Sequence, residues 1–297
     1  MLSLQIDADI ITSLSEKTDK GDQTEIKEIH PESLIFYNSV NIAVGKQGTG
    51  KTLLFMRDIL KLDRLKLPHL ILYITGDGKI TDDTFIYLSQ TLTTPYITIA
   101  HTEAKEIING LLYYKNMYNE LFSTRKLHKL KQKDVLLNAL YLNEFPDYDQ
   151  KNTRLHTILI FDDIAYSKLF KDPYFESLIT KNRHNNIITF FGTQKYTGDA
   201  ISSAIRSQAT SICIYNGFSP RELATIYNNS SIKGLDYQEL KRLYSTVKND
   251  QCLYANSKSS EVKIVDLSHI RQALISIENW KVYLTQSNQL PLKYLSP

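Results

Sequence analysis

Cysteine is scarce in this 297-residue chain, and long apolar runs are missing. The two cysteines, Cys213 and Cys252, are too few for a disulfide framework and too far apart for a CxxC zinc or redox motif. No run approaches the roughly 20 apolar residues of a membrane-spanning helix. The first residues are acidic and lack the basic region of a secretory signal. We therefore expect no signal peptide, no membrane span and a reducing compartment.

Arginine is also scarce: it contributes nine of the 35 basic residues. The net charge is +3, but it is uneven along the chain. Residues 1–33 hold eight acidic side chains and three lysines, a net charge of −5, so the remaining chain carries +8. A basic body permits a nucleic-acid partner. We expect residues 1–33 to form an acidic leader, solvated or partly ordered, and residues 34–297 to form the main domain.

Short apolar runs alternate with longer helix-like segments after the leader. This alternation predicts an α/β fold with a mostly parallel central sheet flanked by helices. The predicted strands are Val40–Val44, His69–Ile74, Tyr96–Ala100, Thr157–Phe161, Ile187–Phe191, Ser211–Tyr215, Gln251–Ala255 and Glu261–Val265. The predicted helices are Gly50–Leu62, Asp82–Thr91, Thr102–Phe122, Lys133–Asn143, Asp172–Arg183, Pro220–Tyr227, Tyr237–Val247 and Ser268–Trp280.

A basic insertion, residues 105–150, interrupts this alternation before the fourth predicted strand. Its length exceeds what one crossover between parallel strands requires. The segment Lys115–Lys133 has six basic residues and one acidic residue, a net charge of +5. Two interpretations remain open. The segment is either a solvated helical face or subunit contact, or an element that contacts nucleic-acid phosphates.

The clearest motif is GKQGTGKT, which matches GxxxxGK[ST]. It directly follows the apolar run Val40–Val44 and precedes a predicted helix, as a P-loop requires. Its glycines allow backbone N–H groups to approach phosphate oxygens at a helix N-terminus. Lys51 would contact the β- and γ-phosphates of ATP, and the Thr52 hydroxyl would bind Mg²⁺. The predicted nucleotide-binding residues are Gly45, Lys46, Gln47, Gly48, Thr49, Gly50, Lys51 and Thr52.

Two carboxylates, Asp162 and Asp163, follow the apolar run Thr157–Phe161. This pattern is typical of a Walker B strand. We expect Asp162 to hold Mg²⁺ through water and Asp163 to polarise the attacking water. Gln194 lies just beyond the next predicted strand. A polar side chain there could contact the γ-phosphate or that water, so we predict a sensor role for Gln194.

Ring-forming ATPases commonly require an arginine from a neighbouring subunit to neutralise charge in the transition state. The candidates are Arg206, before the strand Ser211–Tyr215, and Arg183, at the end of the helix after Walker B. For Arg183, stabilisation of the helix C-terminus is the alternative. Of the two, Arg206 is the favoured candidate and Arg183 the second.

Four segments together resemble a known family: GKQGTGKT, ILIFDDI, KNRHNNIITFFGTQ and IRSQATSICIYN. They resemble the genome-packaging ATPases of poxviruses, other large double-stranded DNA viruses and virophages, within the FtsK–HerA superfamily. The resemblance covers roughly Ser39 to Tyr215. It implies a RecA-like core in which the Walker B and sensor strands flank the P-loop strand. It also implies a homo-oligomeric ring, with six subunits as the family expectation, that moves double-stranded DNA into a capsid.

That resemblance implies ATP and Mg²⁺ as cofactors, and duplex DNA and capsid proteins as partners. The expected location is the cytoplasm of an infected host cell, the virion, or both. Two alternatives stay open: a P-loop kinase of a small molecule, and an assembly or scaffold protein that binds nucleotide without hydrolysing it. The chain lacks an LSGGQ-like transporter motif and an NKxD or TKxD guanine motif.

Overall fold

The computed structural model describes residues 38–64, 68–79, 82–123, 156–164, 169–197, 200–230, 232 and 234–268. The predicted acidic leader and the predicted helix Lys133–Asn143 lie outside these residues. The basic segment from residue 124 onward and the last predicted helix beyond Ser268 also lie outside the described residues.

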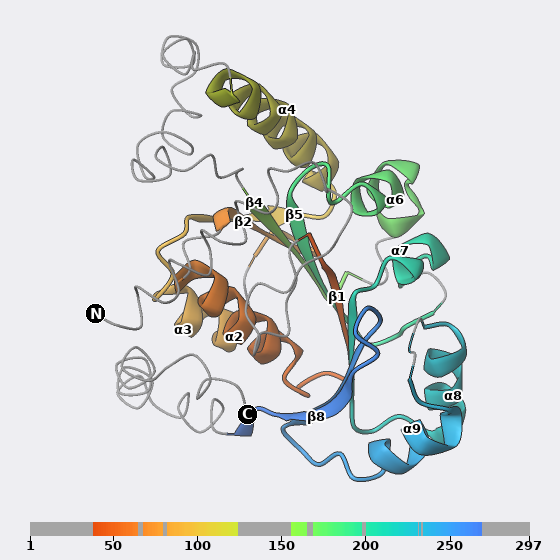
Figure 1. Ribbon diagram of the computed structural model, residues 1–297. Coiled ribbons are helices and arrows are strands. Elements are labelled where there is room, and N and C mark those ends of the chain that lie inside the picture. The colour runs from red at the N-terminus through yellow and green to blue at the C-terminus, as the bar shows by residue number, and fades with distance from the viewer. Residues whose placement is uncertain are drawn as a thin grey trace.

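The described residues build one eight-stranded sheet with the order β3-β2-β4-β5-β1-β6-β7-β8. The strands from β3 to β6 in this order run parallel, and β7 and β8 are antiparallel to their neighbours. The prediction of a mostly parallel sheet in an α/β fold is confirmed (Figure 1). The strands are β1 (Val40–Val44), β2 (Pro68–Thr75), β3 (Tyr96–Ala100), β4 (His156–Asp162), β5 (Ile187–Thr193), β6 (Ser211–Tyr215), β7 (Gln251–Asn256) and β8 (Val262–Asp266).

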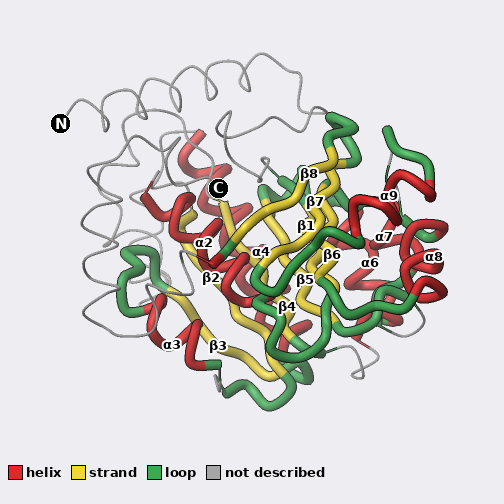
Figure 2. The backbone as a smooth tube through the Cα atoms, turned by 90° about the horizontal axis from the view of Figure 1, so that it is seen from below, coloured by secondary structure: helices red, strands yellow, loops and turns green. Residues whose placement is uncertain are grey.

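Helices cover both faces of the sheet, which explains why its central strands are continuously apolar. In β4, Leu159 and Phe161 belong to the core on one face, and Ile158 and Ile160 to the core on the other. Helices α2 and α3 cover one face, and α4 and α6–α9 cover the other (Figures 1 and 2). The helices are α2 (Lys51–Arg64), α3 (Asp83–Ser89), α4 (Ala104–Ser123), α6 (Pro173–Thr180), α7 (Ser203–Ser207), α8 (Pro220–Asn228) and α9 (Tyr237–Tyr244), with a short 3₁₀ helix, η3 (Leu169–Lys171).

The predicted strands agree with the structure to within two residues at each end, and the helices agree less well. The predicted helix Asp172–Arg183 ends at Thr180, because residues 181–186 form turns that lead into β5. Asn186 completes this reversal with a positive φ of 48°. Helix α7 was not predicted, since five residues are too few to show a helical period.

One implication of the family resemblance is wrong in part. The sensor strand β5 does flank the P-loop strand β1, but the Walker B strand β4 does not. Strand β5 pairs in parallel with both strands and separates them. Gly192 of β5 lies opposite Ala43 of β1 and opposite Asp162 of β4. This insertion places the end of β5 between the P-loop and the Walker B carboxylates.

Candidate active site

The P-loop lies between β1 and α2, in the strand–loop–helix context that the motif predicts. Gly48 and Gly50 adopt positive φ angles of 75° and 97°, a region that glycine enters without steric cost. At Gly45 a Cβ atom would lie 2.5 Å from the Thr49 hydroxyl and 2.8 Å from the Cβ of Tyr215. The Tyr215 hydroxyl donates a hydrogen bond to the Gly50 carbonyl at 2.9 Å. Strand β6 therefore also supports the loop.

Lys51 begins α2, and its ammonium group points back into the loop. Its Nζ donates hydrogen bonds to the carbonyls of Gly45 at 2.9 Å and Lys46 at 3.0 Å. Burial lowers the pKa of Lys51, and the carboxylates of Asp163 and Asp162 oppose that shift. Anionic phosphates bound in the loop would stabilise the charged form of Lys51, because they would compensate for the solvation that burial removes.

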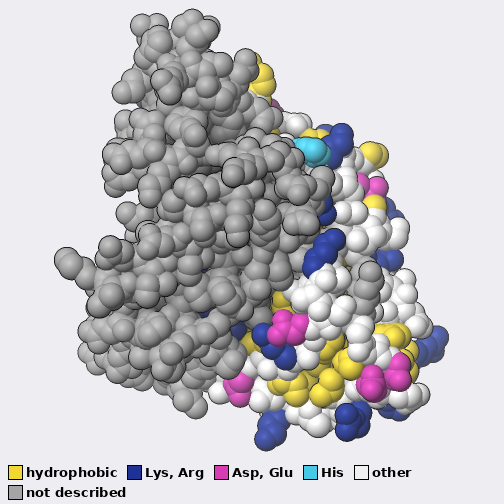
Figure 3. All heavy atoms as spheres, in the orientation of Figure 1, with side chains coloured by type: hydrophobic (Ala, Val, Ile, Leu, Met, Phe, Trp, Pro, Cys, Tyr) yellow, Lys and Arg dark blue, Asp and Glu magenta, His cyan; other side chains and the backbone are white. Residues whose placement is uncertain are grey.

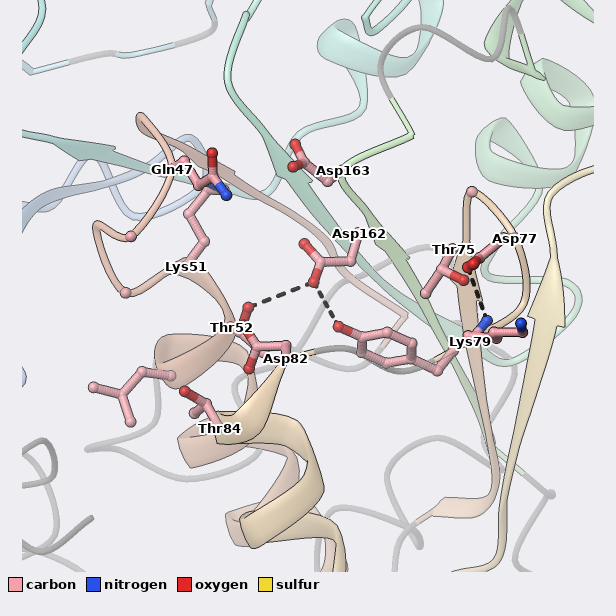
Figure 4. A pocket seen from close by; sticks show the side chains of 15 residues that line it. Gln47, Lys51, Thr52, Thr75, Asp77, Lys79, Asp82, Thr84, Asp162 and Asp163 are labelled. Atoms are coloured by element: carbon pink, nitrogen blue, oxygen red, sulfur yellow. Dashed lines mark hydrogen bonds between the residues drawn. The ribbon is translucent and has the colours of Figure 1, made fainter. Parts of the chain in front are cut away.

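Asp162, the last residue of β4, faces the start of α2. The Thr52 hydroxyl donates to Asp162 Oδ2 at 3.4 Å, and the Tyr73 hydroxyl donates to the same oxygen at 2.5 Å (Figure 4). Burial raises the pKa of Asp162; the Tyr73 hydrogen bond opposes this shift, and the nearby Asp82 carboxylate adds to it. A cation between these groups would stabilise the ionised carboxylate.

Asp163 and Gln194 are brought together by the pairing of β4 with β5. Asp163 follows β4 with a positive φ of 52°, a conformation that Asp adopts more readily than most residues. The Gln194 amide donates to both carboxylate oxygens of Asp163 at 3.1 Å. The predicted sensor and the predicted water-polarising residue are thus hydrogen-bonded.

A cavity of about 620 Å³ opens between the P-loop, the Walker B carboxylates and the end of β2 (Figure 4). It falls within the range of roughly 300–1,000 Å³ that is usual for small-molecule sites. Eight of its lining residues were missed by sequence reasoning. One is Leu53 of α2, and the others come from β2, the segment that follows it and the start of α3: Tyr73, Thr75, Gly76, Asp77, Lys79, Asp82 and Thr84.

A weak signal for part of this wall was present in the sequence. The polar run Thr75–Lys79 directly follows an apolar strand, and parallel strands end at the same edge of a sheet. Tyr73 gave no such signal, because it lies inside the apolar run and resembles an ordinary core residue.

The side chains fit a magnesium–nucleotide complex. Mg²⁺ prefers oxygen ligands and is usually held by one or two carboxylates together with water and substrate phosphates. Thr52 and Asp162 offer a hydroxyl and a carboxylate at the cavity wall, beside the P-loop. Among the described residues, no cluster of three or more His, Cys, Asp or Glu side chains could hold a metal.

The two candidate arginines lie outside the described lining of this cavity. Arg183 lies in the turn before β5, at the amino end of a strand whose carboxyl end carries Gln194. Arg206 lies on α7, where its Nη1 donates to the Ile201 carbonyl at 2.5 Å. The guanidinium carbon of Arg206 is 5.8 Å from the centre of the Tyr196 ring.

No protein-family model and no curated protein matches this chain. Its structure is similar to B204, the genome-packaging NTPase of Sulfolobus turreted icosahedral virus 2, in complex with AMP: TM-score 0.47, 17% identity, covering 76% of this chain and 96% of B204. It is also similar to EssC (ATPases 2 and 3) from Geobacillus thermodenitrificans: TM-score 0.48, 14% identity, covering 77% of this chain and 40% of EssC.

A third similar structure is the pCW3 conjugation coupling protein TcpA with ATPγS: TM-score 0.43, 14% identity, covering 76% of this chain and 60% of TcpA. Within the residues described, none of the helices is long and apolar enough to cross a membrane.

The raised pKa of Asp162 predicts a pH-dependent effect of Asp162→Asn on the free energy of unfolding. A carboxyl with a higher pKa in the folded state destabilises the fold when it is ionised, and this effect disappears as pH falls toward the ordinary pKa of an aspartate carboxyl. Without nucleotide, Asp162→Asn should therefore raise the thermal unfolding midpoint at pH 7.5, and the gain should shrink toward pH 4.

Thermal unfolding of both proteins between pH 8 and pH 4 measures this difference. Asp163→Asn, on the exposed neighbouring carboxylate, is the control for the loss of one negative charge. A lower midpoint for Asp162→Asn at pH 7.5 would contradict the prediction.

Proposed function

We propose that this protein hydrolyses ATP with Mg²⁺ and uses the reaction to move double-stranded DNA into a viral capsid. The observation that carries the ATPase proposal is the meeting of three groups at one cavity wall. The ammonium of Lys51, the hydroxyl of Thr52 and the carboxylate of Asp162 come from two distant parts of the chain. They are the groups that a P-loop site needs for the phosphates and the metal.

Each group has a distinct task in the proposed reaction. Lys51 binds the β- and γ-phosphates with its ammonium group. Thr52 and Asp162 hold Mg²⁺, which neutralises phosphate charge when it is bound. Asp163 orients and polarises the attacking water, and Gln194 holds the Asp163 carboxylate in place through the amide hydrogen bonds at 3.1 Å.

The pair of Asp163 and Gln194 favours hydrolysis over the two alternatives. A scaffold protein that only binds nucleotide has no need of a carboxylate oriented beside the phosphate site. A kinase would use such a carboxylate to accept a proton from a second substrate. Phosphate release from ATP without added acceptor separates hydrolysis from both alternatives.

The proposed arginine comes from a neighbouring subunit of the ring. Arg206 and Arg183 lie outside the cavity of their own subunit, which is compatible with action on a neighbour's nucleotide. Arg206 has one buried nitrogen, Nε, without a hydrogen-bond partner. A structure of the assembled protein in which neither guanidinium lies near a neighbour's phosphates would contradict this assignment.

The DNA part of the proposal rests on the motif resemblance and on the net charge of +8 beyond residue 33. A packaging motor must grip every sequence alike, so it should contact phosphates rather than base edges. On the face drawn in Figure 3, the Lys and Arg side chains of the described residues are dispersed among acidic and polar ones. We propose capsid proteins as further partners, and the host-cell cytoplasm or the virion as the location.

The active-site assignment predicts different losses for two substitutions. Lys51→Ala should abolish hydrolysis and weaken ATP binding, because the phosphates lose their cation. Asp163→Asn should retain ATP binding and lose about 10²–10⁴-fold in turnover, since only the residue that polarises water changes. Phosphate release and the binding of a fluorescent ATP analogue measure the two effects.

Lys241→Ala is the control for Lys51→Ala, because Lys241 is an exposed lysine on α9. It should hydrolyse ATP at the wild-type rate. Equal turnover in wild type, Lys51→Ala and Asp163→Asn would show that ATP is hydrolysed elsewhere or not at all.

The DNA proposal predicts binding that is independent of sequence and weakened by salt. Replacing Lys126, Lys129, Lys131 and Lys133 with Gln should reduce the slope of log affinity against log salt concentration by about 0.9 for each lost phosphate contact. DNA-stimulated hydrolysis should fall and basal hydrolysis should survive, because the P-loop is unchanged. These four lysines lie outside the described residues.

A matched control replaces four exposed lysines of α9 and the β7–β8 region: Lys241, Lys248, Lys258 and Lys263. Fluorescence anisotropy with unrelated duplexes, at several salt concentrations, compares the two variants. If only the control variant shows a smaller slope, the DNA contact is assigned to α9 and the β7–β8 region instead. Tight binding to one sequence, or binding that salt does not weaken, would contradict the DNA proposal.

A further inference from the structure

Tyr73 lies outside every sequence motif of the site, yet its hydroxyl reaches the Walker B carboxylate. It donates to Asp162 Oδ2 at 2.5 Å, whereas the Thr52 hydroxyl approaches the same oxygen at 3.4 Å. Bonds from a hydroxyl to a carboxylate are typically about 2.5–2.7 Å long and stronger than bonds between neutral groups. The orientation of Asp162 therefore depends more on β2 than on the P-loop.

The ring of Tyr73 is fixed by its surroundings. Tyr73 is 2% exposed and belongs to the core between the sheet and α2. Its ring packs against Phe85 of α3, with the ring centres 4.1 Å apart and the planes inclined at 49°. Strand β2 pairs in parallel with β4, with Tyr73 opposite Ile160. The hydroxyl is thus held near the end of β4, where Asp162 lies.

The carboxylate of Asp162 is confined on its other side by β5. A Cβ atom added to Gly192 would lie 2.5 Å from Asp162 Oδ1, so the carboxylate fits only because residue 192 has no side chain. One carboxylate oxygen thus lies against the backbone of β5, and the other accepts the Tyr73 hydrogen bond. This arrangement leaves the side chain little freedom to rotate.

We propose that Tyr73 is a positioning residue that fixes the Asp162 carboxylate for Mg²⁺ bound with the nucleotide. The proposal rests on the proposed function, and Tyr73 acts through Asp162 rather than on the phosphates. Groups that hydrogen-bond a metal-binding carboxylate commonly change metal affinity or activity by about 10–100-fold when they are removed. A neutral hydroxyl suits this task because Asp82 and Asp163 already place negative charge nearby.

Tyr73→Phe tests this role, because it removes the hydroxyl and keeps the ring that packs against Phe85. The control is Tyr254→Phe, which removes a buried hydroxyl on β7 that accepts a hydrogen bond from the Asn256 amide at 3.1 Å. The measurement is ATPγS binding by calorimetry, first in EDTA and then across a titration of Mg²⁺.

Tyr73→Phe should bind ATPγS as the wild type does in EDTA. The Mg²⁺ concentration for half of the metal-dependent gain in affinity should rise about 10–100-fold. Tyr254→Phe should match the wild type in both conditions. An unchanged Mg²⁺ requirement in Tyr73→Phe would overturn the proposal and leave the Tyr73 hydroxyl a purely structural role.

A double-substitution cycle asks whether Tyr73 acts through Asp162. In the Asp162→Asn background, Tyr73→Phe should cause no further change in the Mg²⁺ requirement, since the charged carboxylate is already absent. A further increase of similar size would overturn the proposal, because Tyr73 would then act independently of Asp162. If the wild type shows no Mg²⁺-dependent binding of ATPγS, the proposed function itself fails, and the role of Tyr73 fails with it.

Discussion

The site depends on strand β5, which is hydrogen-bonded in parallel to both the P-loop strand and the Walker B strand. Because these strands share one direction, their carboxyl ends meet at one edge of the sheet. Gly192 lies opposite both Ala43 and Asp162, so its missing side chain leaves room for the Asp162 carboxylate. Gln194 directly follows Thr193, the last residue of β5, and its amide donates a hydrogen bond to the Asp163 carboxylate. A shift in the register of β5 would separate the P-loop, the Asp162 carboxylate and the pair of Asp163 and Gln194.

Opposite charges share this edge without a direct ion pair between Lys51 and Asp162 among the described contacts. Lys51 is hydrogen-bonded to backbone carbonyls of its own loop, and Asp162 to the hydroxyls of Tyr73 and Thr52. Burial lowers the pKa of Lys51 and raises that of Asp162, so both charged forms are disfavoured before ligand arrives. Phosphates and Mg²⁺ would each supply the missing opposite charge, which couples nucleotide binding to metal binding.

Sequence predicted the local parts of this site and missed the non-local ones. The P-loop and the Asp162–Asp163 pair follow apolar runs at fixed spacing, so their placement at strand ends was readable. The insertion of β5 between β1 and β4 was not, because strand order depends on pairing between distant segments. Tyr73 was interpreted as a core residue because its ring does lie in the core. Only the pairing of β2 with β4 reveals that its hydroxyl is hydrogen-bonded to Asp162.

A structure of the assembled protein with Mg²⁺, a non-hydrolysable ATP analogue and duplex DNA tests the central claim most directly. We expect the Lys51 ammonium to contact the β- and γ-phosphates, and Mg²⁺ to lie beside Thr52 and Asp162. We also expect Arg206 or Arg183 of a neighbouring subunit at the same nucleotide. Nucleotide bound away from the P-loop, or phosphates in the loop without contact to Lys51, would contradict the account.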